Sequence, residues 1–571
     1  MNINTEQYFS TVPEIHAPRS VFDRSFTHKT TMNCDYLYPI FIDEALPGDS
    51  FKMHFQVFGR LLNPLVVPVM DELYFETLWF KIPNRLVWTN WKRFCGEQDN
   101  PTDSVDYLLP TIDLDTSNDA LVGTIFDYYG IPTQPASASA GYAIVHRVNS
   151  LPFRCYNLVY NQWMRDENLI NSVPVPMGDT DSYTNYTLLK SSKIHDYFTS
   201  MLPFSQKGAS VALPFDGFAP VVQQGELLKF NLGMSNNTVV EGQLKGSKNL
   251  VAYDKNSSTA SNYLVPVWDT PNYGDTLNFP GTATGSITYK SGLKADLRNI
   301  TGGADINDFR FAIKLQRKRE IDAVSGSRYI EFIKAHFNVD SPDARLQRSE
   351  FLGSTRELID INSVVQTSST DSTSAQGHIT AYGIISNHES GFSTSFTEHS
   401  YVLGIARIRQ VPLYQQGINK LFKRSSLLDF YLPVFNGIGE QPVKKFELVA
   451  TGINNLNLQG DIVDDEAVGF QEAWADYRYR PNMISGILRS GITTSLDAFH
   501  FAQYFVDSHG SPVCPNLNQS FIESGVPVDR SISVNTSKYV PQFVMDFRFN
   551  YECARPMPVR NIPDSLCHQN L

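Results

Sequence analysis

The sequence has no run of apolar residues long enough to cross a lipid bilayer. A membrane-spanning helix needs about 20 consecutive apolar residues. The most apolar stretch, residues 61–70, is interrupted by Asn63, Pro64 and Pro68. The first residues contain neither a basic region nor an apolar core, so we expect no secretory signal peptide and no membrane insertion.

Cysteine is scarce, and its spacing excludes two classes of small scaffold. No two cysteines are close enough for a CxxC motif, which argues against a zinc finger and against a disulfide framework. We expect six free thiols in a chain made in a reducing cytoplasm. These are Cys34, Cys95, Cys155, Cys514, Cys553 and Cys567.

Charged residues are also few, and positive charge is the scarcer sign. They make up 19% of the chain, below the usual quarter, and the net charge is −12. A protein that coats DNA over its whole surface would be basic. Any contact with nucleic acid must therefore be confined to one face or shared with a basic partner.

Sequence signatures of catalysis are missing. There is no phosphate-binding GxxxxGK[ST] loop and no GxSxG nucleophile elbow. His388 and Glu389 lack the second histidine of a zinc protease, and a glycine-rich stretch from Gly437 ends in Pro442 where a dinucleotide-binding motif needs glycine. The acidic run at residues 464–466 could bind a hard cation, although such runs are more often solvated. We predict no catalytic site, cofactor or metal.

What the chain does contain is aromatic residues, 12% of the total, and alternating strand patterns. The aromatic content is enough for a large core and also typical of surfaces buried between copies. Composition alone favours a large β-rich globular protein. Alternation of apolar and polar residues predicts half-buried strands at 51–57 and 543–551, and further strands at 73–82 and 401–411.

The positions of these strands predict an antiparallel sandwich. Strong strands lie near both ends of the chain, and Greek-key connections bring such distant segments together. Too few strands are visible for 571 residues, so long inserted loops must fill the length. Helical patterns at 154–168 and 308–322 predict helices within these insertions.

One segment, residues 225–303, differs in composition from the rest of the chain. It is rich in Gly, Ser, Thr and Asn, which are turn and loop residues. We predict that it is a surface-exposed insertion and that it folds as a small β subdomain.

Basic residues occur in short clusters. For each internal cluster, ordinary solvated or salt-bridged charges are the favoured interpretation. These clusters are Arg317-Lys318-Arg319, Lys420 with Lys423-Arg424, and Lys444-Lys445. A separate set lies near the two termini, and we predict that it faces nucleic acid. Its members are Arg19, Arg24, Arg555 and Arg560.

Several blocks of sequence, taken together, resemble one protein family. They lie in the expected order along nearly the whole chain, except within 225–303. They include Arg19-Ser20-Val21-Phe22-Asp23-Arg24-Ser25, Ile42-Asp43-Glu44-Ala45-Leu46-Pro47-Gly48-Asp49, Leu151-Pro152-Phe153-Arg154-Cys155-Tyr156-Asn157, Ala475-Asp476-Tyr477-Arg478-Tyr479-Arg480-Pro481 and Ala554-Arg555-Pro556-Met557-Pro558. The sequence is thus similar to the major capsid proteins of the Microviridae, gokushovirus branch.

The resemblance implies a mainly β fold, a single eight-stranded viral jelly-roll β-sandwich over residues 1–571 with long insertions that carry some helices. Copies would form a T=1 icosahedral shell around a circular single-stranded DNA genome, assembled in the cytoplasm of the host bacterium. Residues 225–303 would form a protrusion at the threefold axes, used in attachment to a host receptor. The family also uses a minor pilot protein and a small basic DNA-binding protein, and the latter would offset the net charge of −12.

Two other functional classes stay open from the residues themselves. One is a β-sandwich that binds or cleaves carbohydrate, with Asp464 and Asp465 as an acid/base pair. The absent signal peptide and the absent motifs count against it. The other is a cytoplasmic single-stranded DNA-binding protein that forms no shell, and the net acidity counts against that.

Overall fold

A computed structural model of the chain describes residues 18–115, 122–133, 145–209, 211, 306–325, 329–339, 347–370, 376–457, 460–532 and 541–560, together with short strands between residues 221 and 295. The chain forms two compact units. The first combines Met1–Gly208 with Arg319–Leu571, and the second is Ala209–Lys318.

The first unit is built around two antiparallel sheets. One sheet has the order β1-β21-β4-β17-β16, and β2 also pairs with β21. Its strands are β1 (Ser20–Asp23), β2 (Phe26–Met32), β4 (Ser50–Leu61), β16 (Asp360–Val365), β17 (Ile379–Ser395) and β21 (Phe543–Arg555). The second sheet has the order β15-β5-β18-β3. Its strands are β3 (Tyr38–Ala45), β5 (Leu73–Pro83), β15 (Glu350–Leu358) and β18 (Ser400–Gln410).

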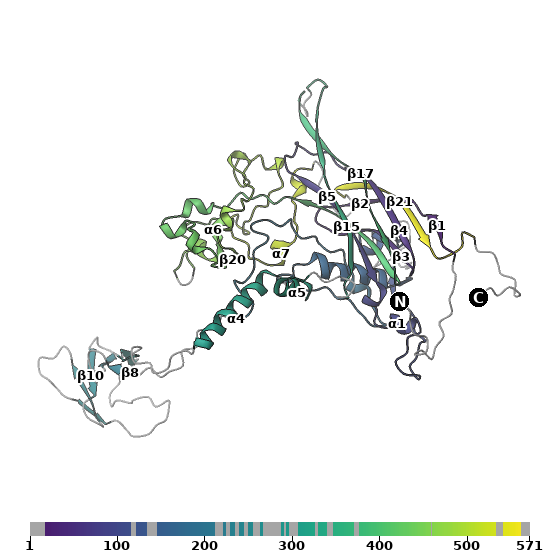
Figure 1. Ribbon diagram of the computed structural model, residues 1–571. Coiled ribbons are helices and arrows are strands. Elements are labelled where there is room, and N and C mark those ends of the chain that lie inside the picture. The colour runs from purple at the N-terminus through teal and green to yellow at the C-terminus, as the bar shows by residue number, and fades with distance from the viewer. Residues whose placement is uncertain are drawn as a thin grey trace. The chain divides into compact units, whose positions relative to one another are not determined.

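The four strands expected from the sequence are all present, as β4, β5, β18 and β21. The distant ends of the chain meet as predicted, because β21 lies between β2 and β4 and pairs with both. Figure 1 shows β21, close to the C-terminus, beside β4 from the first part of the chain. The protein is therefore mainly β, with its strands in antiparallel sheets.

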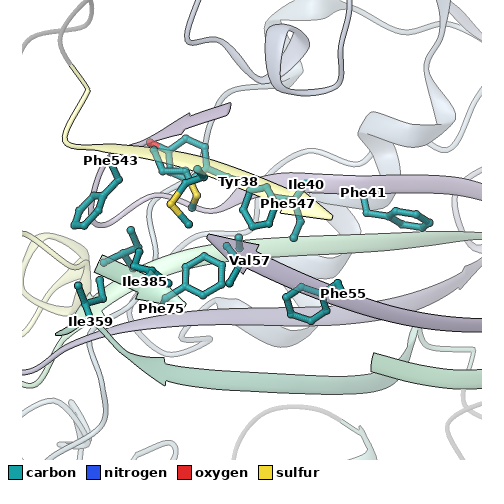
Figure 2. Packing of buried hydrophobic residues seen from close by; sticks show 14 of the residues in the cluster. Tyr38, Ile40, Phe41, Phe55, Val57, Phe75, Ile359, Ile385, Phe543 and Phe547 are labelled. Carbon is teal, nitrogen blue, oxygen red and sulfur yellow. The ribbon is translucent and has the colours of Figure 1, made fainter. Parts of the chain in front are cut away.

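One hydrophobic core joins the two sheets into a sandwich. Alternate side chains of β4 and β21 point inward and meet side chains of β3 and β5, as Figure 2 shows for Phe55, Phe75 and Phe547. The rings of Phe55 and Trp79 are 5.4 Å apart, and those of Phe75 and Phe547 are 6.1 Å apart. Such aromatic pairs add to the stabilisation that burial provides.

A second core covers the other face of the β5–β18 sheet. It contains α3 (Leu151–Val159), which continues into a π-helical turn, Tyr160–Met164, and so confirms the helix expected at 154–168. Within this region the side chains of Arg154 and Asp181 are completely buried and form an ion pair at 2.8 Å. Because β5 and β18 are covered on both faces, neither shows a clean alternation of polar and apolar residues.

Loops and short elements make up the rest of the first unit. A third apolar cluster organises the segment between β18 and β21. The short elements are α1 (Trp91–Phe94), β6 (Thr111–Asp115), α2 (Ile125–Tyr128), β7 (Val145–Asn149), β19 (Glu440–Lys444), α6 (Lys445–Leu448), β20 (Ala467–Glu472) and α7 (Gln519–Ile522). Cys34, Cys95, Cys155, Cys514 and Cys553 are free, as expected, and Cys567 lies outside the described residues.

The second unit contains the segment predicted to be an insertion. Its strands form a five-stranded sheet of order β12-β11-β10-β9-β13 and a β14-β8 pair. They are β8 (Val221–Gln223), β9 (Lys229–Gly233), β10 (Val239–Leu244), β11 (Asn249–Asp254), β12 (Tyr263–Pro266), β13 (Ile287–Lys290) and β14 (Leu293–Ala295).

Two helices come next along the chain. They are α4 (Ile306–Val324), which confirms the helix expected at 308–322, and α5 (Tyr329–Phe337).

Candidate functional site at the terminal strands

The pairing of β1 with the end of β21 brings together three of the four arginines predicted to face nucleic acid. Ser20 lies opposite Arg555, and Phe22 lies opposite Cys553. Arg19 and Arg24 flank β1, so both lie close to the end of β21. The fourth, Arg560, follows β21 in the chain and is exposed.

Asp43 of β3 is the acceptor at the centre of this cluster. Its Oδ2 atom pairs with the guanidinium of Arg24, accepts a hydrogen bond of 2.7 Å from the Tyr551 hydroxyl, and lies 3.5 Å from Nη2 of Arg555. Partial burial lowers the pKa of Arg24, but the pair with Asp43 outweighs this and the pKa is raised overall. Burial, together with the Asp43 carboxylate, raises the pKa of Tyr551 well above its usual value.

A second carboxylate, Asp49, holds Arg555 from the other side. The Asp49 side chain is fully buried and accepts a 2.9 Å hydrogen bond from the backbone N–H of Leu46, while Nε of Arg555 lies 3.4 Å away. Burial raises the pKa of Asp49, and the Leu46 N–H and Arg555 oppose the rise. Arg555 also donates to the carbonyl of Glu44 at 2.7 Å. Residues 43–49 thus fasten the end of β21 to β3 and the turn that follows it.

The four predicted arginines therefore divide into two pairs with different surroundings. Arg24 and Arg555 are neutralised by Asp43 and Asp49. Arg19 is exposed and donates to the Ser50 hydroxyl at 2.5 Å. Among the described residues, no carboxylate lies within 4.0 Å of Arg19 or Arg560.

Three more exposed cations on the same sheet were missed by searching for basic runs. Lys52 and Arg60 of β4 and Arg548 of β21 point away from the core, at the exposed positions of the alternation. The alternation of apolar and polar residues in β4 and β21 could have identified these three cations, because it places their positions on the solvent face of the sheet. Lys29 of β2 is also exposed, but it pairs with Asp546 at 2.5 Å.

The internal basic clusters are largely compensated by nearby carboxylates. Lys420 and Arg424 pair with Asp476. Two more pairs join Lys444 to Asp465 at 3.0 Å and Lys445 to Glu466 at 2.7 Å. The favoured interpretation of these clusters as salt-bridged charges is thus confirmed, and the third cluster lies in α4.

The acidic run at residues 464–466 has a structural role. Buried Asp464 accepts hydrogen bonds from the backbone N–H groups of Thr451 and Gly452 at 2.8 and 3.0 Å, and so holds a loop. The part of the chain that the structure describes contains no cluster of three His, Cys, Asp or Glu side chains arranged to hold a metal ion. None of the described helices is long and apolar enough to span a membrane.

Replacing Asp43 tests the role assigned to the cluster. We expect Asp43→Ala to lower the free energy of unfolding by about 1.5–3 kcal/mol, the range for hydrogen bonds to charged groups, because Arg24, Tyr551 and Arg555 all lose their shared acceptor. Thermal unfolding of the variant measures this change.

The matched control for Asp43 is Asp546→Ala. It breaks the exposed pair with Lys29, and such surface pairs contribute about 0–1 kcal/mol. Equal unfolding midpoints for the two variants would show that Asp43 does not fasten the terminal strands.

Comparisons with known proteins find similar sequences over nearly the whole chain. A model of the family described as capsid protein (F protein) matches residues 10–564. Capsid protein VP1 of Bdellovibrio phage phiMH2K is 40% identical over 98% of each chain. The capsid proteins VP1 of Chlamydia phage 1 and Spiroplasma virus 4 are 36% and 34% identical, each over 97% of both chains. The predicted resemblance to Microviridae capsid proteins is confirmed, and the chain belongs to the capsid protein (F protein) family, whose role in the virus particle is structural rather than enzymatic.

Proposed function

We propose that this chain is the major capsid protein that self-assembles, with icosahedral T=1 symmetry, into the shell around a circular single-stranded DNA genome. The observation that carries the proposal is the family match over residues 10–564. Assembly would take place in the cytoplasm of the host bacterium. Closed symmetry lets one set of contacts repeat around the whole shell, so that no single contact has to be strong.

We further propose that the sandwich is an eight-stranded viral jelly roll. The pairing of its strands supports this, because they pair in nested fashion: β2 with β21, β3 with β18, β4 with β17, and β5 with β15. An antiparallel ribbon of four nested pairs, rolled into two sheets, is the arrangement of two Greek keys. The contacts β21–β4 and β18–β5 then join the pairs within each sheet. Strands β1 and β16 extend the edges.

The terminal strands are the part of the subunit that we propose to face the genome. Arg19 and Arg560 would neutralise phosphates directly, and the neighbouring Arg24 and Arg555, whose charges Asp43 and Asp49 neutralise, would hold the strand ends in place. A chain with a net charge of −12 cannot neutralise a genome alone. A small basic DNA-binding protein would supply the remaining charge, and a minor pilot protein would complete the particle.

The proposed function predicts that the chain forms particles. It also predicts that the amount of DNA in these particles depends on Arg19 and Arg560. Produced alongside the other genes of its source, the chain should form uniform shells that hold nuclease-protected single-stranded DNA. The double variant Arg19→Gln, Arg560→Gln should form shells of the same size with several-fold less protected DNA, because two free phosphate-binding charges are lost from every subunit. Light scattering, negative-stain microscopy and DNA quantification measure these outcomes.

A matched control for the arginine variant is Lys29→Gln, which removes a cation already paired with Asp546. Its DNA content should equal that of the wild type. Wild-type chains that remain monomers with all partners present would contradict the shell function. Normal DNA content in the double variant would contradict only the assignment of the arginines.

The segment 225–303 is proposed to lie on the outside of the shell, at the threefold protrusion, and to contact the host receptor. Its polar composition supports this, as does its inclusion in a compact unit, Ala209–Lys318, separate from the sandwich. Because the strands of the sandwich pair without help from this unit, the sequence of the unit can vary while the subunits still assemble.

Deleting the insertion tests this assignment. With residues 225–303 replaced by a short Gly-Ser linker, shells should still form, because the nested strand pairs are untouched. Adsorption of the particles to host cells should fall tenfold or more, as measured by depletion of free particles. Unchanged adsorption would refute the receptor role.

A further inference from the structure

The loops between β18 and β21 expose an unusual number of apolar side chains. Those used in the argument are Phe422, Leu427, Leu428, Val434, Tyr479 and Met483, here called the apolar surface. Val434 is 81% exposed, Phe422 is 76% exposed and Met483 is 69% exposed. These loops lie near α6 and β20, which are labelled in Figure 1.

Two loops that are distant in sequence form this surface together. The guanidinium of Arg424 pairs with Asp476 and lies over the rings of both Phe430 and Tyr477, 5.6 and 4.3 Å from their centres. Phe422 and Met483 line one cleft of about 170 Å³. These contacts join the two loops, and the remaining members of the apolar surface lie on the same loops, within a few residues of the contacts.

The backbone under the apolar surface is held in place. Asp429 accepts hydrogen bonds from the backbone N–H groups of Ser425 and Ser426 at 2.8 and 2.7 Å. These bonds lower the pKa of Asp429 to about 2, so the carboxylate stays charged and the turn stays closed near neutral pH. The side chains of Leu427 and Leu428 within this turn are exposed.

The extent of the surface matches that of a protein interface. A buried aromatic side chain covers about 150–250 Å², so six large side chains that are mostly exposed amount to several hundred Å². Monomeric proteins rarely expose contiguous apolar patches beyond a few hundred Å². A stable interface uses about 800 Å² on each partner. The six apolar side chains alone amount to less than this, so the polar rim around them must supply the rest of the buried area.

The charges at the rim decide what kind of partner fits. Arg480 and Arg489 line the cleft, together with one carboxylate, Glu447, which is buried and accepts a hydrogen bond of 2.9 Å from the Tyr197 hydroxyl. No carboxylate of the described residues lies within 4.0 Å of either arginine, so the exposed charges at the rim are positive. A twofold contact of this surface with itself would bring the same cations face to face. The chain as a whole carries −12, so a different surface of another copy offers the opposite charge.

We propose that the apolar surface packs against a different, acidic surface of a second copy of this chain in the assembled shell. This inference rests on the proposed shell function, and it assigns one of the contacts between neighbouring subunits of the shell. Such a head-to-tail contact closes into a ring under rotational symmetry. The apolar side chains supply the buried area, and Arg480 and Arg489 select the partner surface.

Methionine oxidation measures the contact directly. Intact particles and subunits released from them are treated with dilute hydrogen peroxide, and each methionine is followed by mass spectrometry. In released subunits, Met483 and Met70, which is 76% exposed, should oxidise at similar rates. In particles, oxidation of Met483 should slow tenfold or more.

Several outcomes would overturn the proposal. Equal oxidation of Met483 in particles and in released subunits would leave the shell function intact and show that this surface is free. Protection of Met483 only when the minor proteins are present, and not in shells of this chain alone, would show that another protein covers it. Failure of the wild type to form shells would instead refute the function itself.

A pair of variants tests the same contact by assembly. Phe422→Asp places a charge on the apolar surface at a site exposed in the subunit, so the unfolding temperature of the subunit should not change while the yield of shells falls tenfold or more. Phe422→Leu keeps the site apolar and should assemble normally. Normal shell yield from Phe422→Asp would overturn the proposal.

Discussion

The pairing of β21 with β2 and β4 is the constraint on which the rest of the structure depends. It joins the two ends of the chain in one sheet and adds Phe547, Phe549 and Tyr551 to the core. The backbone N–H of Cys34 reinforces the closure with a buried 2.7 Å hydrogen bond to Gln542. Without β21, β2 would lose its strand partner and β4 would lose one of its two. The long insertions are tolerated because the strands of the sandwich pair without them. The same pairing of β21 brings the arginines of the terminal strands together.

The distribution of charge follows from the same framework. Carboxylates neutralise most of the internal basic clusters, and Asp43 and Asp49 neutralise two of the terminal arginines. On an acidic chain, the cations that remain uncompensated are informative. Arg19 and Arg560 lie by the terminal strands, whereas Arg480 and Arg489 lie beside an exposed apolar surface. We propose that the first pair meets phosphate and the second meets an acidic protein surface, so that one subunit would contact its genome and its neighbour through separate regions.

Sequence patterns predicted the sandwich but not the geometry of its charged cluster. The alternation in β4 and β21 was readable because each strand has one buried and one exposed face. The long strand β17, rich in Gly and Ser, gave no such signal, because its apolar neighbours come from β4 through tertiary pairing. Proximity of Arg24 and Arg555 was expected from their closeness to the termini. Their shared acceptor Asp43 could not be foreseen, since it lies on β3 in the other sheet and reaches them only through the packing of the two sheets. Likewise, Asp476 is far in sequence from the Arg424 that it neutralises.

The most direct test of the central role of β21 is native-state hydrogen exchange of the folded chain, resolved by segment. Amides in paired strands exchange only when the pairing opens, and the slowest ones report global unfolding. If β21 holds the sandwich closed, its amides and those of β4 should exchange at one common, slowest rate, while the edge strands β1 and β16 exchange faster. Exchange of β21 that is much faster than that of β4 would show that the sandwich persists without its C-terminal strand, and would contradict this account.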